Sequence, residues 1–284
     1  MDPADPGLDL DALRGLRGRL RPSRAPLERI ACHLEDHDGY VAFSGGKDSA
    51  VVLHLTRRVD PAVPVAWFDS GLEWPETRTY IEDLAQAWNL SLTVIPAQPT
   101  ALEILQASGA WDHHAPAARV PRLGRILVEQ PAARAHEMFG AGELWGVRAE
   151  ESNGRRRGYA SWLRRELTAT CHGCCQTDPT GRPTVQQRSR HGGVIRRRDG
   201  TIAYGPIWDW STEQVWQYLA AHGIPVNPVY RKLRRLGAPD TALRVASVLD
   251  GAHLEHGRVT WLRRGWPQLY HELENQLPRL RELT

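Results

Sequence analysis

The chain has 284 residues, enough for one large α/β domain with a smaller appended region. A hydrophobic fraction of 41% supports a sizeable core and excludes wholesale disorder. No stretch approaches the roughly 18 apolar residues of a membrane span, and the acidic residues 1–5 do not resemble a secretory signal. We therefore expect a cytoplasmic protein with no membrane partner.

Arginine dominates the basic residues, although the net charge is only +3. Lysine occurs only at positions 47 and 232. The arginines cluster in the second half, at residues 155–157, 188–190, 196–198 and 231–235. Guanidinium groups pair bidentately with phosphate, so these clusters predict a bound polyanion. A solvated basic face without a ligand is the alternative interpretation.

The first 25 residues read as a polar lead-in with one short helix over residues 8–20. Pro26 can start a second helix, in which Leu27, Ile30 and Leu34 form one apolar stripe. Strands and helices then alternate: strands are predicted at 40–43, 63–68 and 92–95, and helices at 49–59 and 77–88.

This alternation predicts a parallel sheet with helices on both faces. Ligands of such sheets bind at the carboxyl ends of the strands. A glycine-rich loop follows the first predicted strand, and Asp69 ends the second. We expect both to face one crevice.

Beyond residue 100, the chain reads as mostly helical to residue 140, followed by a strand at 143–147 that ends in Arg148. Residues 154–205 are polar, basic and rich in Gly, Pro and Cys, which predicts a loop or small insertion. Ser211 is a plausible N-cap for a helix with Val215 and Leu219 on its core face. The segment from residue 238 onward is helical in character.

The glycine-rich loop has the properties of an anion cradle. Two glycines permit tight backbone geometry, the following helix presents its positive N-terminus, and a lysine adds a full charge. It is not a Walker A loop, because the glycine spacing differs and an aspartate follows the lysine. The loop residues are Ser44, Gly45, Gly46, Lys47, Asp48 and Ser49.

This loop resembles the Ser-Gly-Gly-Lys-Asp-Ser signature of the ATP pyrophosphatase (PP-loop) superfamily. The resemblance implies an adenine nucleotide alpha hydrolase-like fold: a doubly wound, mainly parallel α/β sheet with a smaller, mostly helical C-terminal region. It also implies that the loop holds the pyrophosphate leaving group while AMP passes to a substrate oxygen. We expect a lead-in at 1–25, a PP-loop domain at 26–225 that includes a basic, Cys-containing loop at 154–205, and a helical region at 226–284.

Three further segments resemble the phosphoadenosine phosphosulfate reductase-like branch of that superfamily. They are Asp69-Ser70-Gly71-Leu72-Glu73-Trp74-Pro75-Glu76-Thr77, Gly146-Val147-Arg148-Ala149-Glu150-Glu151-Ser152 and Pro206-Ile207-Trp208-Asp209-Trp210. The resemblance implies that Asp69, Gly146 and Arg148 join the loop residues 44–49 in binding ATP. It assigns catalytic roles to Lys47, Asp48 and Arg148, with Arg148 steadying the charge on departing pyrophosphate. Mg²⁺ is expected beside Asp69 and Asp48.

The intact Lys47-Asp48 pair favours ATP over the sulfated nucleotide of the true reductases, whose loops usually depart from this signature. No cysteine follows Cys175, where reductases carry one near the C-terminus. The resemblance is strongest to the ATPases of DNA phosphorothioation. It implies DNA as acceptor, a cysteine desulfurase as sulfur donor, and other modification-complex subunits as partners.

Three cysteines lie together at Cys171, Cys174 and Cys175, while Cys32 stands alone. Flanking arginines favour the thiolate, which is both a nucleophile and a metal ligand. The cluster is expected to carry persulfide sulfur through Cys171 and Cys174, to hold a 4Fe-4S cluster through all three thiols, or to be inert, with zinc as a minor variant. Cys32 is expected to be a buried small hydrophobe.

Several alternatives stay open. The chain is either the ATP-splitting enzyme described above or a phosphoadenosine or adenosine phosphosulfate reductase that uses thioredoxin. A tRNA or small-molecule sulfurtransferase and a non-catalytic nucleotide-sensing subunit are further alternatives. The oligomeric state and the final sulfur acceptor are not determined by the sequence.

Overall fold

A computed structural model describes residues 24–108, 124–173, 181–240, 243–246, 248, 258–277 and 280–281. The helix predicted at residues 8–20 lies outside these ranges. None of the described helices combines the length and the apolar character that a membrane span requires.

Within the described residues, six strands form one sheet in the order β3-β2-β1-β4-β6-β5. Neighbouring strands are parallel except for β5 and β6, which are antiparallel. The predicted mainly parallel sheet is therefore confirmed. The strands are β1 (Gly39–Ala42), β2 (Pro64–Asp69), β3 (Ser91–Pro96), β4 (Gly142–Leu144), β5 (Val194–Arg196) and β6 (Ile202–Tyr204).

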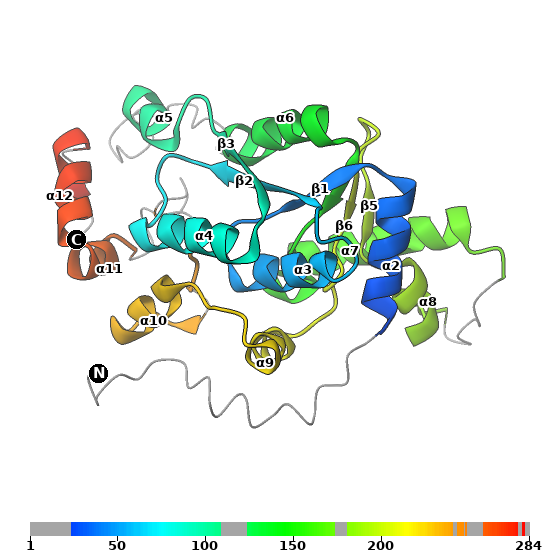
Figure 1. Ribbon diagram of the computed structural model, residues 1–284. Coiled ribbons are helices and arrows are strands. Elements are labelled where there is room, and N and C mark those ends of the chain that lie inside the picture. The colour runs from blue at the N-terminus through cyan, green and yellow to red at the C-terminus, as the bar shows by residue number, and fades with distance from the viewer. Residues whose placement is uncertain are drawn as a thin grey trace.

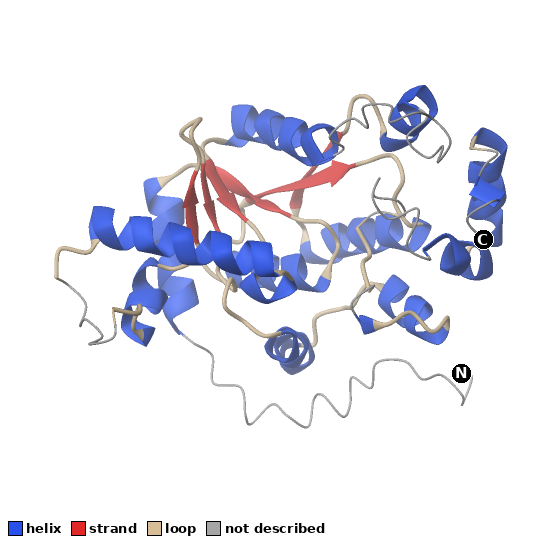
Figure 2. Ribbon diagram, turned by 180° about the vertical axis from the view of Figure 1, so that it is seen from behind, coloured by secondary structure: helices blue, strands red, loops and turns tan. Residues whose placement is uncertain are grey.

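Helices cover both faces of the sheet, as a doubly wound fold requires (Figures 1 and 2). Helix α6 (Gln130–Phe139) packs on strands β1 to β4 from one side. Helices α3 (Lys47–Arg57) and α4 (Pro75–Trp88) cover the other side, and α9 (Thr212–His222) packs on α3 (Figure 1). Four further elements of this part of the chain are α2 (Arg24–Asp36), α5 (Ala101–Ser108), the π-helix η2 (Arg125–Glu129) and the 3₁₀ turn η3 (Ala149–Glu151).

The order of the strands reverses between β1 and β4. The chain moves outward from β1 through β2 to β3, then returns to pair β4 with the other side of β1. In doubly wound sheets this switch point opens a crevice at the carboxyl ends of the strands, because the loops on either side leave toward opposite faces. The glycine-rich loop follows β1 and Gly146 follows β4, so both lie at this crevice.

The prediction of a loop at residues 154–205 was wrong. This region contains α7 (Asn153–Thr170), α8 (Val185–His191) and both strands of the antiparallel pair. Tyr159, Leu163 and Glu166 are the buried residues of α7, at helical spacing. Arginine and leucine favour helix, and Glu166 is buried because Arg196 donates from Nε to its Oε1 over 2.7 Å. Because most residues of α7 are charged or polar, the sequence pattern did not indicate the buried face formed by Tyr159, Leu163 and Glu166.

The C-terminal region is helical, as predicted, with α10 (Pro228–Arg235), α11 (Arg258–Gly265) and α12 (Pro267–Gln276). Trp266 packs on Trp74 with ring centroids 3.9 Å apart. Glu76 of α4 accepts from both Lys232 Nζ and Trp266 Nε1, each over 2.7 Å. The same hydrophobic cluster contains residues of the sheet and of this region, so a domain boundary at residue 225 stays a prediction.

Candidate active site

The phosphate loop connects β1 to α3. Gly45 has φ of 72°, in the left-handed region that favours glycine. Helix α3 begins at Lys47, two residues earlier than predicted, with Gly46 as its N-cap and no side-chain cap. The first turn of α3 therefore presents backbone N–H groups and a positive dipole end to an anionic ligand.

Asp48 connects two cations at the start of α3. Its Oδ2 accepts from Lys47 Nζ over 2.6 Å, and its Oδ1 accepts from Arg148 Nε over 2.6 Å. The side chains of Lys47 and Asp48 are each 14% exposed. The ion pair thus holds the Lys47 ammonium beside the loop instead of leaving it to sample solvent.

Arg148 is almost entirely buried, with 2% of its surface exposed. Besides Asp48, it donates to Glu150 Oε2 (2.8 Å), the Trp210 carbonyl (2.9 Å) and Thr212 Oγ1 (3.1 Å). It is not among the residues that line the cavity described next. Arg148 therefore positions Asp48 and, through it, Lys47, and this geometry differs from the direct phosphate contact expected from the sequence.

A cavity of about 500 Å³ opens beside the phosphate loop, within the size range of small-molecule sites. It is bounded by the loop, the ends of β2 and β4, the π-helix η2, and the first turns of α7 and α10. Residues 243–246 close one side. Lys47, Asp48 and Gly146, three of the predicted site residues, all line it.

Asp69 does not line this cavity, whereas its neighbours Phe68 and Ser70 do. Its Oδ2 accepts from Arg78 of α4 over 2.6 Å, and its Oδ1 accepts from the Gly71 amide over 2.9 Å. Successive side chains of a strand point to opposite faces. The structure thus directs Asp69 away from the crevice and places Ser70 in it.

Glu73 supplies a carboxyl group at the position where the sequence led us to expect Asp69. It lines the cavity, and its Oε1 accepts from the Ser70 hydroxyl over 2.6 Å. Its Oε2 is buried and has no hydrogen-bond partner among the residues that the structure describes. Burial raises the pKa of Glu73 to about 7, against the opposing hydrogen bonds from Ser70.

Gly146 brings the end of β4 against the phosphate loop. The prediction of a strand to residue 147 was three residues too long, because β4 ends at Leu144. A Cβ atom on Gly146 would lie 2.6 Å from the Ser49 amide nitrogen and 2.7 Å from the Asp48 carbonyl carbon. Only glycine permits this approach between the two segments.

Residues outside the predicted set also reach the loop. Asn227, 2% exposed, donates from Nδ2 to the Gly45 carbonyl over 3.1 Å, and Tyr230 Oη accepts from the Lys47 amide over 3.1 Å. Arg155 and Glu151 form an ion pair at the cavity wall. The sequence Asn227-Pro228 carries an N-cap signal followed by proline at N1, which locates the start of α10. Its contact with a loop 182 residues away has no local signal.

Cys171 is not brought to the cavity. Cys171, half-buried, is the C-cap of α7, whereas Arg155 in the first turn of α7 lines the cavity. At about 1.5 Å per residue, the helix puts about 24 Å between them. Cys174 and Cys175 lie outside the described residues, and within the described part no three His, Cys, Asp or Glu side chains gather to hold a metal ion.

The expectation that Cys32 is buried was wrong. Cys32 is exposed on α2, where Ile30 and His33 are buried. Two residues along a helix correspond to about 200° of rotation, so Cys32 lies on the face opposite Ile30.

A doubly wound sheet with an anion-binding loop at its switch point defines the class of nucleotide-binding α/β enzymes. A family model described as "Phosphoadenosine phosphosulfate reductase domain" matches residues 39–242. The chain belongs to this family, in agreement with the resemblance of its motifs.

Curated relatives carry the name phosphoadenosine 5'-phosphosulfate reductase. The protein of Alkalilimnicola ehrlichii is 27% identical over 262 residues, covering 90% of this chain and 89% of the relative. That of Xanthomonas oryzae is 28% identical over 227 residues, covering 78% and 79%. Among solved structures, phosphoadenylyl-sulfate reductase from Candida auris in its phosphate complex aligns with a TM-score of 0.49 at 17% identity, covering 80% of this chain and 90% of that one.

Proposed function

We propose that the cavity binds ATP and that the chain cleaves it between the α- and β-phosphates, transferring AMP to an acceptor and releasing pyrophosphate. The observation that carries this proposal is the placement of the Lys47 ammonium at the cavity, held by Asp48 Oδ2 at 2.6 Å. A fixed cation beside a helix N-terminus stabilises the charge that develops on a departing pyrophosphate.

The shape of the cavity supports an adenine nucleotide. Its apolar part is lined by small side chains, Ala42 and Ala66, with Phe68 and Leu127 beside them. Such a surface accommodates a flat base, while the loop at the other part provides donors for phosphates. Mg²⁺ is usually held by substrate phosphates and one or two carboxylates, and Asp48 is the one of the two predicted ligands that lines the cavity.

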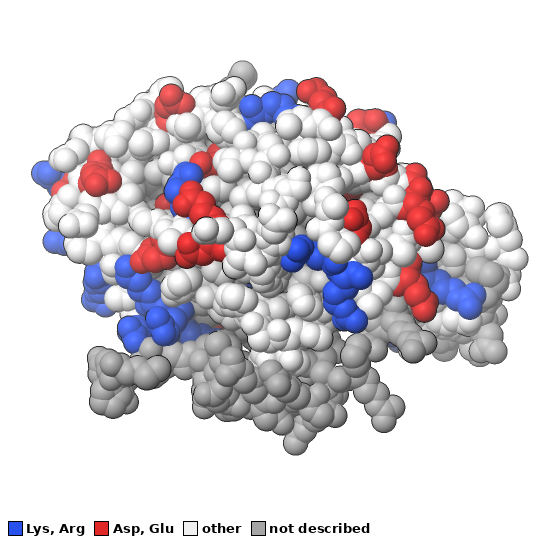
Figure 3. Space-filling model, in the orientation of Figure 1, with Lys and Arg blue, Asp and Glu red and all other residues white. Residues whose placement is uncertain are grey.

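DNA is the acceptor we favour, because basic side chains extend outward from the cavity on two helices. Figure 3 shows Lys and Arg side chains gathered at the lower left, over α10 and α11. Helix α10 continues from Tyr230 at the cavity into the basic run at residues 231–235. On α7, the exposed arginines are Arg155, Arg156, Arg157, Arg164 and Arg165. The outer sulfur of a persulfide would then attack the adenylated phosphate and displace AMP, and a thiol reductant would cleave the resulting S–S bond to leave the phosphorothioate.

The sulfur is proposed to come from a cysteine desulfurase partner. The separation of about 24 Å along α7 between Arg155 and Cys171 supports an external donor over direct attack by Cys171 in the same cavity. DNA binding of this kind would weaken steeply with salt, because each phosphate contact releases counterions.

The test is incubation with ATP labelled at the α-phosphate, with and without duplex DNA and sulfide, scoring AMP and AMP-linked DNA against ADP. We expect AMP and pyrophosphate from the wild type and none from Lys47→Ala. Arg58→Ala is the matched control, since Arg58 is an exposed cation at the opposite end of α3 and does not line the cavity. Retained AMP formation in Lys47→Ala would contradict the proposal.

Sulfonucleotide reduction is the second candidate function. The family match over residues 39–242 and the printed names of the relatives favour it. Release of sulfite from a sulfated adenosine nucleotide in the presence of reduced thioredoxin, without AMP formation from ATP, would establish it in place of the first. The opposite pattern would exclude it.

A further inference from the structure

Tyr230 brings a hydroxyl group to the phosphate loop from the first turn of α10. Its Oη accepts from the Lys47 backbone N–H over 3.1 Å, and a Cβ atom built on Gly46 would lie 3.5 Å from it. The side chain is 6% exposed and lines the cavity. The hydroxyl thus contacts the part of the loop where an anionic ligand would bind.

This hydroxyl has an unused donor. A phenol can accept hydrogen bonds and donate one. In the described part of the chain, Tyr230 accepts from Lys47 and donates to no protein group. Burial and the nearby Asp48 charge raise the pKa of the Tyr230 phenol, so the group keeps its proton at physiological pH.

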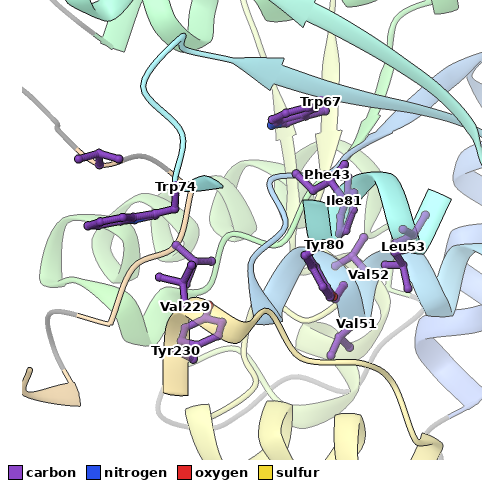
Figure 4. Packing of buried hydrophobic residues seen from close by; sticks show 14 of the residues in the cluster. Phe43, Val51, Val52, Leu53, Trp67, Trp74, Tyr80, Ile81, Val229 and Tyr230 are labelled. Atoms are coloured by element: carbon purple, nitrogen blue, oxygen red, sulfur yellow. The ribbon is translucent and has the colours of Figure 1, made fainter. Parts of the chain in front are cut away.

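The position of the hydroxyl is fixed by its surroundings. The Tyr230 ring packs edge-on against Trp216, with centroids 5.3 Å apart. Asn227, one turn earlier, bonds to the Gly45 carbonyl. The start of α10 is therefore tied to the loop on both sides of Gly46, and Figure 4 shows Tyr230 beside Val229 in the cluster that also holds Tyr80.

We propose that Tyr230 is a further catalytic residue of this site, whose hydroxyl donates a hydrogen bond to the phosphate group held by the loop. The Lys47 amide does not contact the ligand itself. It donates to the Tyr230 hydroxyl and so polarises it, and the hydroxyl donates to the phosphate in the cavity. Donors aimed at a leaving pyrophosphate stabilise the charge that it gains. This inference rests on the proposed function, because it assigns the ligand's phosphates to the loop.

The test is Tyr230→Phe, which removes one oxygen and keeps the ring packing. Inorganic pyrophosphate and ATP are the probes, with binding measured by calorimetry and corrected for the folded fraction from a thermal melt. A hydrogen bond to a charged group predicts a loss of about 10-fold to 100-fold in affinity, together with a lower kcat for AMP formation.

Tyr80→Phe is the matched control. Tyr80 is also buried, but its hydroxyl donates to the Pro225 carbonyl over 3.0 Å and it does not line the cavity. This variant should lower the melting temperature and leave pyrophosphate affinity unchanged.

Wild-type affinity and kcat in Tyr230→Phe would overturn the inference while the proposed function stands. A lower melting temperature with unchanged affinity would also overturn it, since that pattern reports a purely structural hydroxyl. If the wild type binds neither ATP nor pyrophosphate, the proposed function fails and the inference falls with it.

Discussion

Arg148 Nε donates to Asp48 Oδ1 over 2.6 Å, joining the segment after β4 to the first turn of α3. The two residues are 100 positions apart in the chain. Arg148 is buried and Asp48 lines the cavity. The ion pair therefore anchors the phosphate loop to the protein interior. The Lys47 ammonium bound to the other carboxylate oxygen is thereby fixed as well.

Replacing Asp48 with Asn should test this arrangement. The substitution keeps the size of the side chain and removes the charge shared by Lys47 and Arg148. Breaking a buried ion pair from one side leaves an uncompensated charge, so we expect a loss of about 3 kcal/mol in the free energy of unfolding. Urea unfolding measures it. Asp83→Asn, at an exposed position on α4, should stay within about 0.5 kcal/mol of wild type.

Gly146→Ala should separate β4 from the phosphate loop. Its new methyl group would meet backbone atoms of Asp48 and Ser49 within 2.7 Å, which neither segment can avoid without moving. We expect destabilisation of about 1–3 kcal/mol and at least a 10-fold loss of pyrophosphate affinity.

The control for Gly146→Ala is Gly158→Ala in α7, where a Cβ meets nothing within 4 Å. Alanine in a helix should stabilise the protein there by up to about 1 kcal/mol. Wild-type affinity in Gly146→Ala would show that the close approach is dispensable.

Glu73 should make stability depend on pH. Its pKa is about 7 in the folded protein against a model-compound value of 4.5. The folded state therefore holds this proton more tightly, and the associated stability is lost as pH rises from about 4.5 through about 7. Glu73→Gln should flatten the curve by about 1–3 kcal/mol between pH 4.5 and 8. Thermal melts at each pH provide the measurement, with exposed Glu82→Gln as the control; parallel curves for Glu73→Gln and wild type would contradict the assignment.

Asn227→Ala should weaken the attachment of the phosphate loop to the start of α10. The Asn227 amide donates to Gly45 O and to Thr77 Oγ1, and its Oδ1 accepts from the Val229 amide as the N-cap of α10. Losing the cap and stranding a buried carbonyl should cost about 2–4 kcal/mol. We also expect weaker pyrophosphate binding in calorimetry. Asn153→Ala, at an exposed helix start, is the control, and equal effects of the two variants would refute the special role of Asn227.

Local patterns predicted the elements that carry the phosphate loop. Apolar runs bounded by glycine and aspartate located β1 and β2 to within one residue at each end, and Ser211, predicted as an N-cap, is the N-cap of α9. The error at α7 had a local cause as well: arginines at residues 155–157 and 164–165 surround the buried residues, and one of these, Glu166, is itself charged, so the helix shows little apolar periodicity.

The sequence by itself determined the fold class, the family and the loop of residues 44–49: the loop and the family motifs are short local segments, and the fold class follows from the order of strands and helices along the chain. Tertiary structure decided which side chains line the cavity. Strand alternation directed Asp69 away from the cavity and Ser70 into it, and the turn between β2 and α4 brought Glu73 there. Arg148 is buried, so it positions Asp48 and does not line the cavity. The packing of α10 places the Tyr230 hydroxyl against the phosphate loop. These outcomes depend on contacts between segments far apart in the chain, and local sequence patterns do not predict such contacts.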